Sequence, residues 1–231
     1  PEPPLYFARM KRDNKAGPPV LGALPTPAKR SAADMATTTS ATSTIIDTRP
    51  WAAFKAGHIP GSLYIPLGNS FSTDAGALIA ASDAITLIVH PRNLDEAVRA
   101  LIRIGLDSIV GWFDLADVGQ LTAAGISLAT SPEITVDQAR ARIDTADPFI
   151  LDVRRRTEFD EGHIPGATNI SHTRLRDRLA DLPKDRPVLV NCLSGGRSAR
   201  ACSLLQKHGY DATNIAGGIT AWNAAHAPAA R

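Results

Sequence analysis

Short apolar runs alternate along the chain with longer segments in which apolar residues recur every three or four positions. The runs at 85–89 and 188–190 have the length and aliphatic composition of buried strands. The segments 95–104 and 198–208, which follow them, have the period of helices and each ends at a glycine. Alternation of buried strands with helices is typical of a parallel sheet covered by helices on both faces. The predicted fold class is therefore α/β.

A sequence repeat shows that this pattern occurs twice. The segment Ile45–Arg49 recurs as Ile150–Arg154, with an aspartate and an arginine in the same places. Gly57–Gly61 recurs unchanged as Gly162–Gly166. Such self-similarity indicates repeated structural units. We therefore predict two copies of one domain.

The first 43 residues differ from the repeat in composition. They are Pro-rich and basic up to Arg30, and then rich in Ser, Thr and Ala. Because such a composition buries little apolar surface, we expect 1–43 to be an extended arm or linker that precedes the domains 44–130 and 131–231. The chain opens at Pro1 rather than at a methionine, so we also expect this arm to trail an absent upstream domain.

Composition and charge narrow the class of protein. A chain of 231 residues with 44% hydrophobic residues suits two modest cores, and a net charge of +2 indicates no polyanionic partner such as nucleic acid. No apolar run is long enough to span a membrane, so we expect no membrane contact. The six histidines are scattered, so we expect no metal site, and we expect no cofactor either. Two cysteines, Cys192 and Cys202, argue against a disulfide scaffold and for a reducing compartment, with the cytoplasm as the expected location.

The candidate chemistry lies between the strand at 188–190 and the helix that follows it. Backbone N–H groups at a helix N-terminus favour an anion, and two glycines allow several of them to face one point. A cysteine placed there beside a cation favours its nucleophilic thiolate form, and Arg197 is the expected cation. A buried structural cysteine beside a Gly-rich turn is the alternative. The predicted anion-binding loop consists of Cys192, Leu193, Ser194, Gly195, Gly196 and Arg197.

The first copy lacks this loop. Its strand at 85–89 is followed by His90, Pro91, Arg92 and Asn93, with no cysteine or glycine. We expect His90 to stand where Cys192 stands in the second copy. Pro91 has no N–H group and a fixed φ, so the same anion site cannot form. The first domain is therefore predicted to be inactive.

Several of these motifs together resemble the rhodanese family. They are the loop, the two Asp-x-Arg motifs, the two Gly-His-Ile-Pro-Gly motifs, and the segment Asn214–Gly218 with Trp222 beyond it. The resemblance covers nearly the whole chain from about Ile45. It implies two tandem rhodanese-like domains, each with a parallel sheet covered by helices on both faces.

The resemblance also implies an activity. Rhodanese sulfurtransferases carry sulfur as a persulfide on the cysteine that opens a six-residue loop, whereas related phosphatases place five residues between cysteine and arginine. Four residues separate Cys192 from Arg197, which implies sulfur transfer through a Cys192 persulfide. By the same resemblance, Asp152 has a mainly structural role and supports the loop together with Arg154.

The expected donor is thiosulfate or a low-molecular-weight persulfide, and the acceptor is a thiophile such as cyanide, sulfite or a thiol. Leu193 and Ser194 are neutral and Glu158 lies six residues after Asp152, so the positive field around the loop is weak. A glutathione-type persulfide therefore stays open as the donor.

The order of the parts resembles a known architecture. An inactive and an active rhodanese domain behind a basic arm are similar to the C-terminal half of bacterial fusions that begin with a metallo-β-lactamase-fold persulfide dioxygenase, which implies a role in sulfide detoxification. Two alternatives are kept: a non-catalytic scaffold for that upstream enzyme, and a cysteine-dependent phosphatase or arsenate reductase of the same fold. Whether the chain forms a homo-oligomer is left open.

Overall fold

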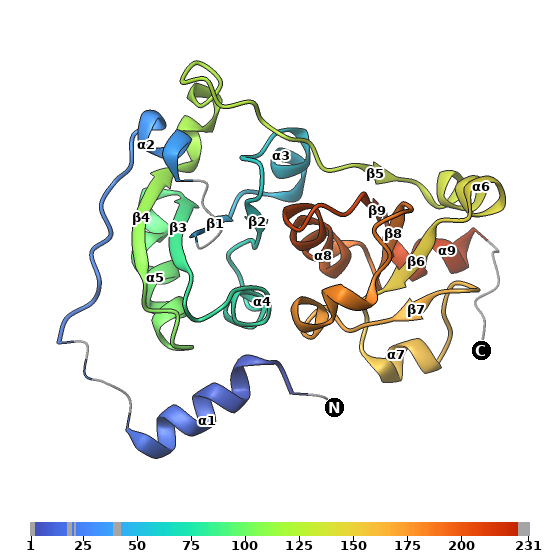
Figure 1. Ribbon diagram of the computed structural model, residues 1–231, viewed down its shortest axis with the longest axis horizontal. Helices are drawn as coiled ribbons and strands as arrows, with labels where there is room; N and C mark the ends of the chain where they lie inside the picture. The colour runs from blue at the N-terminus through green and yellow to red at the C-terminus, as the bar shows by residue number, and fades with distance from the viewer. Residues whose placement is uncertain (1–2, 18–19, 21, 39–42, 226–231) are drawn as a thin grey trace. The chain divides into compact units, whose positions relative to one another are not determined.

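Two parallel sheets, one in each half of the chain, organise the fold (Figure 1). The structure is a computed structural model that describes residues 3–17, 20, 22–38 and 43–225. The chain divides between Ala129 and Thr130 into two units, here called the N-terminal and C-terminal domains. Both domains are α/β units with parallel strands, so the predicted fold class is confirmed.

The C-terminal domain has a five-stranded sheet in the order β5-β9-β8-β6-β7. All its strand pairs are parallel, and β8 is hydrogen-bonded to both β6 and β9. Its elements are β5 Glu133–Ile134, α6 Val136–Ala146, β6 Phe149–Asp152, α7 Arg156–Asp160, β7 Thr168–Asn169, the 3₁₀ helix η3 Leu175–Asp181, β8 Val188–Asn191, α8 Gly196–Lys207, β9 Ala212–Ile215 and α9 Gly218–Ala224.

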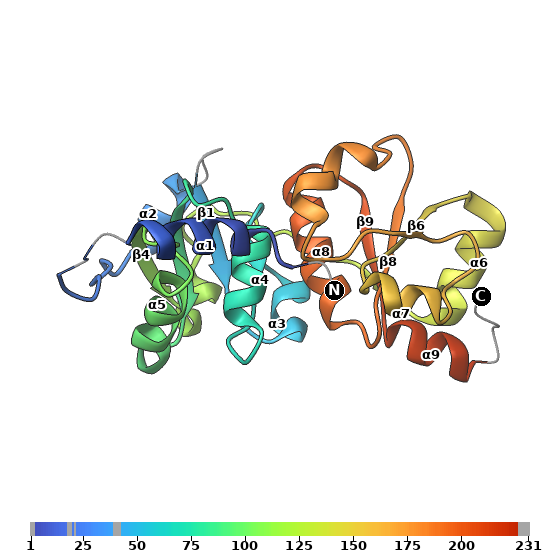
Figure 2. The ribbon, with the colours of Figure 1, turned by 90° about the horizontal axis from the view of Figure 1, so that it is seen from below.

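Helices cover both faces of this sheet. On one face, Ile150, Leu189 and Ile215 form a core with residues of α6 and α9, among them Trp222. On the other face, α8 packs on β8 and β9, with η3 beside it (Figure 2). The strand β8 is therefore buried on both sides, which explains its uninterrupted apolar run.

The N-terminal domain repeats this plan with the order β2-β1-β3-β4. Its helices α4 and α5 pack against each other. The elements are β1 Ser43–Asp47, α3 Trp51–Ala56, β2 Leu63–Tyr64, α4 Phe71–Leu78, β3 Ala84–Val89, the 3₁₀ helix η1 Pro91–Asn93, α5 Leu94–Ile102, β4 Ile109–Asp114 and the 3₁₀ helix η2 Leu115–Gln120, preceded by α1 Tyr6–Ala16 and α2 Ala32–Thr37.

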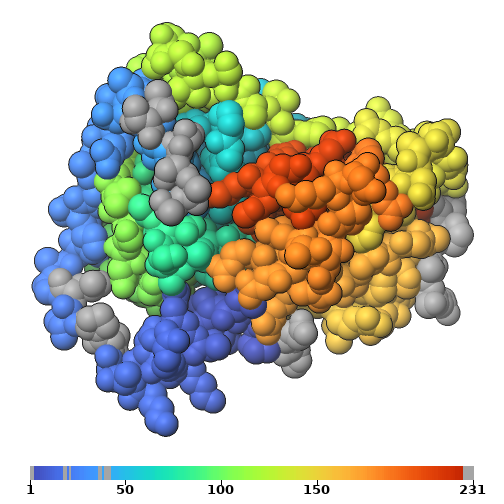
Figure 3. Space-filling view, in the orientation of Figure 1, coloured from blue at the N-terminus to red at the C-terminus, as the bar shows by residue number. Residues whose placement is uncertain are grey.

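Residues expected to lie in an extended arm form part of this N-terminal domain. The backbone of residues 28–30 pairs with Trp112 in β4 through two hydrogen bonds of 2.7 and 3.0 Å and a parallel bridge. The helix α2 follows, and its Met35 is fully buried against Ile45 and Phe113. Residues 28–37 thus take the places that β5 and α6 have in the C-terminal domain. In Figure 3 the blue segment containing them lies along the green of β4.

The helices that follow these two edge segments, α2 and α6, begin with the same type of N-terminal cap. Ser31 and Asp34 cap α2 reciprocally, and Thr135 and Gln138 cap α6 in the same way. The expectation of an extended arm is therefore corrected for residues 28–37, while residues 1–2, 18–19, 21 and 39–42 of the expected arm lie outside the described residues. Edge pairing and one buried methionine stabilise a segment whose composition alone suggested a linker.

The earliest described helix, α1, is also not extended. Its Tyr6 is buried against α4, where Gly76 leaves room for the ring: a Cβ at Gly76 would lie 2.4 Å from a Tyr6 ring carbon. The Arg9 guanidinium donates to the carbonyl of Ile104. Across the described ranges, none of the helices has both the length and the apolar character of a membrane span.

Candidate active site

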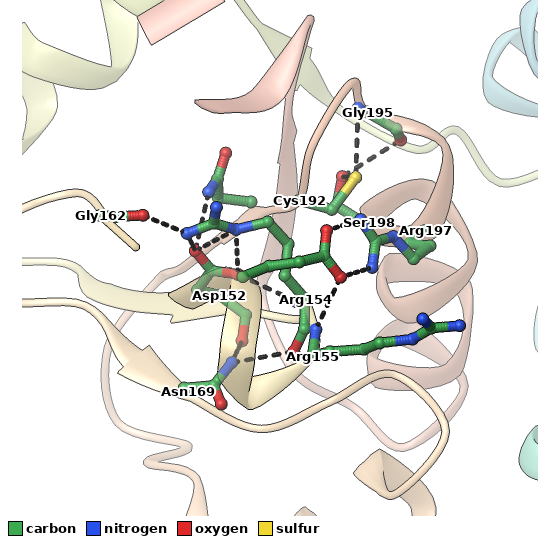
Figure 4. Close-up of polar contacts among 11 residues, drawn as sticks. Asp152, Arg154, Arg155, Gly162, Asn169, Cys192, Gly195, Arg197 and Ser198 are labelled. Carbon is green, nitrogen blue, oxygen red and sulfur yellow. Dashed lines mark hydrogen bonds and ion pairs between the residues drawn. The ribbon is translucent and has the colours of Figure 1, made fainter. Parts of the chain in front are cut away.

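The cysteine loop lies where the central strand of the C-terminal sheet ends. The strand β8 stops at Asn191, Cys192 follows directly, and α8 begins at Gly196 (Figure 4). In open α/β sheets, ligands bind beyond the carboxyl ends of the strands. The strand run and the glycines thus place Cys192 at the usual position of a reactive group in this architecture.

Two hydrogen-bond donors converge on the sulfur of Cys192. The N–H of Gly195 lies 3.1 Å from Sγ, and the hydroxyl of Ser198 lies 3.3 Å from it. Gly195 has a φ of +98°, a conformation that favours glycine and that turns its N–H back toward the sulfur. Cys192 itself is only 1% exposed. A negative charge on Sγ would therefore be held by fixed donors rather than by water.

Ser198 was missed by the sequence analysis. It lies in the first turn of α8, is fully buried, and shares the apolar stripe of Cys202 and Leu205 at helical spacing. A polar residue on such a stripe is the signal that could have identified it. Burial raises the pKa of the Cys202 thiol well above its usual value, with the charge of Cys192 adding to the effect, so Cys202 remains a core thiol.

The N-terminus of α9 holds the loop in place through two backbone hydrogen bonds. The N–H of Ile219 donates to the carbonyl of Cys192 at 2.8 Å, and the N–H of Thr220 donates to that of Leu193 at 3.1 Å. This approach requires glycine at 218, because a Cβ there would lie 2.3 Å from the Cys192 oxygen. With these carbonyls held by α9, the following N–H of Gly195 faces the sulfur.

The outer loop residues are presented to solvent. Leu193 is 48% exposed, and Ser194 and Gly196 are also exposed. Their side chains add no charge around Cys192. These outer loop side chains are therefore uncharged, while the guanidinium of Arg200 donates to the carbonyl of Gly196 at 2.8 Å.

Arg197, the expected cation of the loop, forms an ion pair with a carboxylate of α7. Its two terminal nitrogens donate to both oxygens of Glu158, at 2.7 and 2.6 Å. Hydrogen bonding by Arg197 is the main reason that the pKa of Glu158 falls to about 2, and the same pair raises the pKa of Arg197. The sequence analysis assigned Arg197 to the anion. This pair ties the loop to α7, and the charge of Cys192 also raises the pKa of Arg197, so the role of Arg197 beside a bound anion stays a prediction.

Asp152 and Arg154 form a buried brace beneath the loop. The guanidinium of Arg154 binds both carboxylate oxygens of Asp152 and also donates to the carbonyl of Gly162 at 2.6 Å (Figure 4). The side chain of Asn191, next to Cys192 in the chain, donates to Asp152 at 3.2 Å. Asn169 donates to the backbone carbonyls of Asp152 and Arg154. The brace thus joins the ends of β6 and β8 and holds the start of the loop.

His163 lies in the turn network around this brace. Its Nδ1 lies 3.0 Å from the carbonyl of Phe159, and its ring stacks on that of Phe159. In the described ranges, no group of three or more His, Cys, Asp or Glu residues is arranged to hold a metal ion.

Comparison with known protein families shows which family this chain belongs to. The model of the rhodanese-like domain matches residues 29–110 and 135–225. The chain belongs to the rhodanese-like domain family. It has two copies of the domain, and the first match begins where the edge pairing at residues 28–30 begins.

Individual relatives match over about one domain. A sulfurtransferase of Allochromatium vinosum is 40% identical over 80 residues, which are 34% of this chain and 75% of the relative. The thiosulfate sulfurtransferase GlpE of Pseudoalteromonas translucida is 32% identical over 94 residues, covering 40% and 90% of the two chains. A rhodanese-like domain protein of Staphylococcus aureus, of known structure, is 34% identical, with a TM-score of 0.38 and coverage of 39% and 90%.

The first rhodanese-like domain retains the brace and lacks the loop. Arg49 binds both oxygens of Asp47 and donates to the carbonyl of Gly57 at 2.7 Å, just as Arg154 does in the second domain. His58 also stacks on Phe54. The brace therefore belongs to the architecture of the rhodanese-like domain, whether or not a reactive cysteine lies above it.

The strand register corrects the expected equivalence of His90 and Cys192. Asp47 is paired with Ile88, whereas its counterpart Asp152 is paired with Asn191. Val89, which is fully buried, therefore occupies the place of Cys192. His90 stands one residue later and accepts a hydrogen bond from the N–H of Arg92. The sequence repeat did not reveal this shift because β3 runs one residue further than β8.

Proposed function

We propose that this chain is a sulfurtransferase that carries the transferred sulfur as a persulfide on Cys192. The observation that supports it most is the convergence of the Gly195 N–H and the Ser198 hydroxyl on the Cys192 sulfur. Both donors suit a sulfur that becomes negatively charged during the reaction. The names of the matched relatives, a sulfurtransferase and a thiosulfate sulfurtransferase, agree with this proposal.

The reaction has two steps. The thiolate of Cys192 attacks the outer sulfur of thiosulfate or of a low-molecular-weight persulfide. A new S–S bond forms on Cys192 while the S–S bond of the donor breaks, and its electron pair leaves with sulfite or with a thiolate. An acceptor such as cyanide or a thiol then attacks the outer sulfur, and the thiolate of Cys192 leaves.

The charges of the loop side chains bear on the choice of donor. Arg197 is paired with Glu158, and Leu193 and Ser194 are uncharged. A doubly charged thiosulfate therefore gains less from Arg197 than it would from an unpaired cation, while a singly charged persulfide loses less by this arrangement. We propose both donors as substrates and include both in the test.

The test uses the reduced full chain, incubated separately with thiosulfate and with glutathione persulfide, followed by intact-mass measurement and peptide mapping. We expect a gain of one sulfur atom on Cys192 that cyanide removes. Cys192→Ser should gain none, and Cys202→Ala, which removes the other thiol, should behave like the wild type. No sulfur on Cys192 with either donor, or turnover of an aryl phosphate instead, would overturn the proposal.

For the first domain we propose a scaffold function. Its brace is intact, but Val89 stands in the place of Cys192, so it has the architecture without the reactive group. We further propose that it joins the active domain to an upstream metallo-β-lactamase-fold domain that supplies persulfide. Isolation of the native protein and measurement of its mass would test this part, since a chain without such a domain contradicts it.

A further inference from the structure

Ser198 is a buried hydroxyl with two competing acceptors. Its Oγ lies 3.3 Å from Sγ of Cys192 and 3.1 Å from the carbonyl oxygen of Gly195, and the residue has no exposed surface. A hydroxyl has a single hydrogen to donate. It can therefore bond to the sulfur or to the carbonyl, but not fully to both.

Helix formation and packing do not explain a serine at this position. Alanine is the better helix former, and the buried Ala199 and Ala201 of the same helix show that small apolar side chains fit there. Burial of a hydroxyl is unfavourable unless it finds a partner. The partners of Ser198 are the reactive sulfur and the residue whose N–H already binds that sulfur.

We propose that Ser198 stabilises the thiolate of Cys192, switching its hydrogen bond between Sγ and the Gly195 carbonyl as the charge on Sγ appears and disappears. This rests on the proposed sulfur transfer. When Sγ carries the charge as a thiolate, the hydroxyl donates to Sγ. Once the persulfide has formed, the negative charge lies on the outer sulfur and the hydroxyl returns to Gly195. When the acceptor removes the outer sulfur, Sγ leaves as a thiolate and the hydroxyl binds it again.

This assignment predicts different effects on the two steps. In the first step Sγ is the nucleophile, so loss of the hydroxyl lowers the amount of thiolate and slows the step chiefly at low pH. In the second step Sγ is the leaving group, so loss of the hydroxyl slows the step at every pH. Loss of one hydrogen bond to a charged group should slow the affected step roughly ten- to hundredfold.

The experiment compares the full chain with Ser198→Ala and Ser198→Thr, which keeps the hydroxyl. Ser203→Ala is the matched control, because Ser203 donates from the same helix to the carbonyl of Arg200 rather than to the sulfur. Single-turnover mass spectrometry gives the rates of sulfur uptake and of release to cyanide. The rate of alkylation of Cys192 by iodoacetamide against pH reports the thiolate without requiring sulfur transfer.

We expect the alkylation profile of Ser198→Ala to move to higher pH and its release of sulfur to slow at every pH, with Ser198→Thr and Ser203→Ala close to the wild type. An unchanged profile and an unchanged release rate in Ser198→Ala would overturn the assignment. If the wild type takes up no sulfur but the profile still moves, the sulfurtransferase function fails and the thiolate role stands. Urea unfolding of each variant confirms that the comparison is made on folded protein, and alanine, a strong helix former, suits α8.

Discussion

Gly218→Ala is the substitution that tests most directly how the loop is held. A Cβ at this position would lie 2.3 Å from the Cys192 oxygen and 2.8 Å from the Leu193 carbonyl carbon. Ordinary contacts of this kind are about 3.5 Å, so the loop and α9 must separate by roughly 1 Å. The hydrogen bonds from Ile219 and Thr220 to the loop are then lost or weakened.

The expected loss of stability has two sources. Alanine at the φ of +56° observed for Gly218 is strained by about 1 kcal/mol, and two lost hydrogen bonds contribute about 1 kcal/mol each. The total of about 3 kcal/mol leaves a typical domain folded. Displacement of a reactive atom by about 1 Å slows a reaction about a hundredfold, so sulfur uptake should fall far more than the folded fraction.

Gly209→Ala is the matched control. Gly209 has a comparable φ of +78°, but a Cβ there would meet nothing within 4 Å. It should therefore lose only about 1 kcal/mol of stability and keep its rate of sulfur uptake. Urea unfolding and single-turnover sulfur uptake are measured for both variants. If Gly218→Ala is no less stable and no slower than Gly209→Ala, the fastening of the loop by α9 is refuted.

Three further predictions concern the rest of the fold. Met35→Ala should lower the free energy of unfolding by about 2–5 kcal/mol in urea titrations, and an unchanged value would show that α2 is not part of the core. Glu158 has its pKa lowered from 4.5 to about 2, so its ion pair stabilises the fold above that range and is lost as the pH falls through it. The stability difference between the wild type and Glu158→Gln should therefore shrink between pH 4.5 and about 2 in urea unfolding, whereas a constant difference would contradict the pairing. Arg49→Met and Arg154→Met each leave a buried carboxylate unpaired and should lower the free energy of unfolding by about 3–5 kcal/mol. Only Arg154→Met should also slow sulfur uptake. Equal slowing by both variants would argue against a local role for the brace.

The sequence predicted the repeated α/β plan because the signals for it are local. Apolar runs, the glycines that end helices and the recurrence of Asp-x-Arg can be read without knowledge of packing. The same holds for the loop at Cys192, whose glycines and position between strand and helix are adjacent in the chain. These features agreed with the strands, helices and junctions of the structure.

The features that were missed depend on contacts between distant residues. Residues 28–30 pair with Trp112, about eighty positions later, and a Pro-rich composition gives no sign of this pairing. The pairing of Arg197 with Glu158 spans 39 residues, so the sequence showed the cation without showing this carboxylate partner. The shift that puts Val89 in the place of Cys192 arises from strand register, which sequence alignment of the two copies cannot supply.

The attachment of the loop to α9 sets an order of events during synthesis. Cys192 and its glycines leave the ribosome before Gly218, because chains are made from the N-terminus onward. Until α9 arrives, the carbonyls of Cys192 and Leu193 have no donors to fix them, and the N–H of Gly195 is not held toward the sulfur. The backbone donors around the sulfur of Cys192 would therefore be fixed in place only after the last helix of the domain has been made.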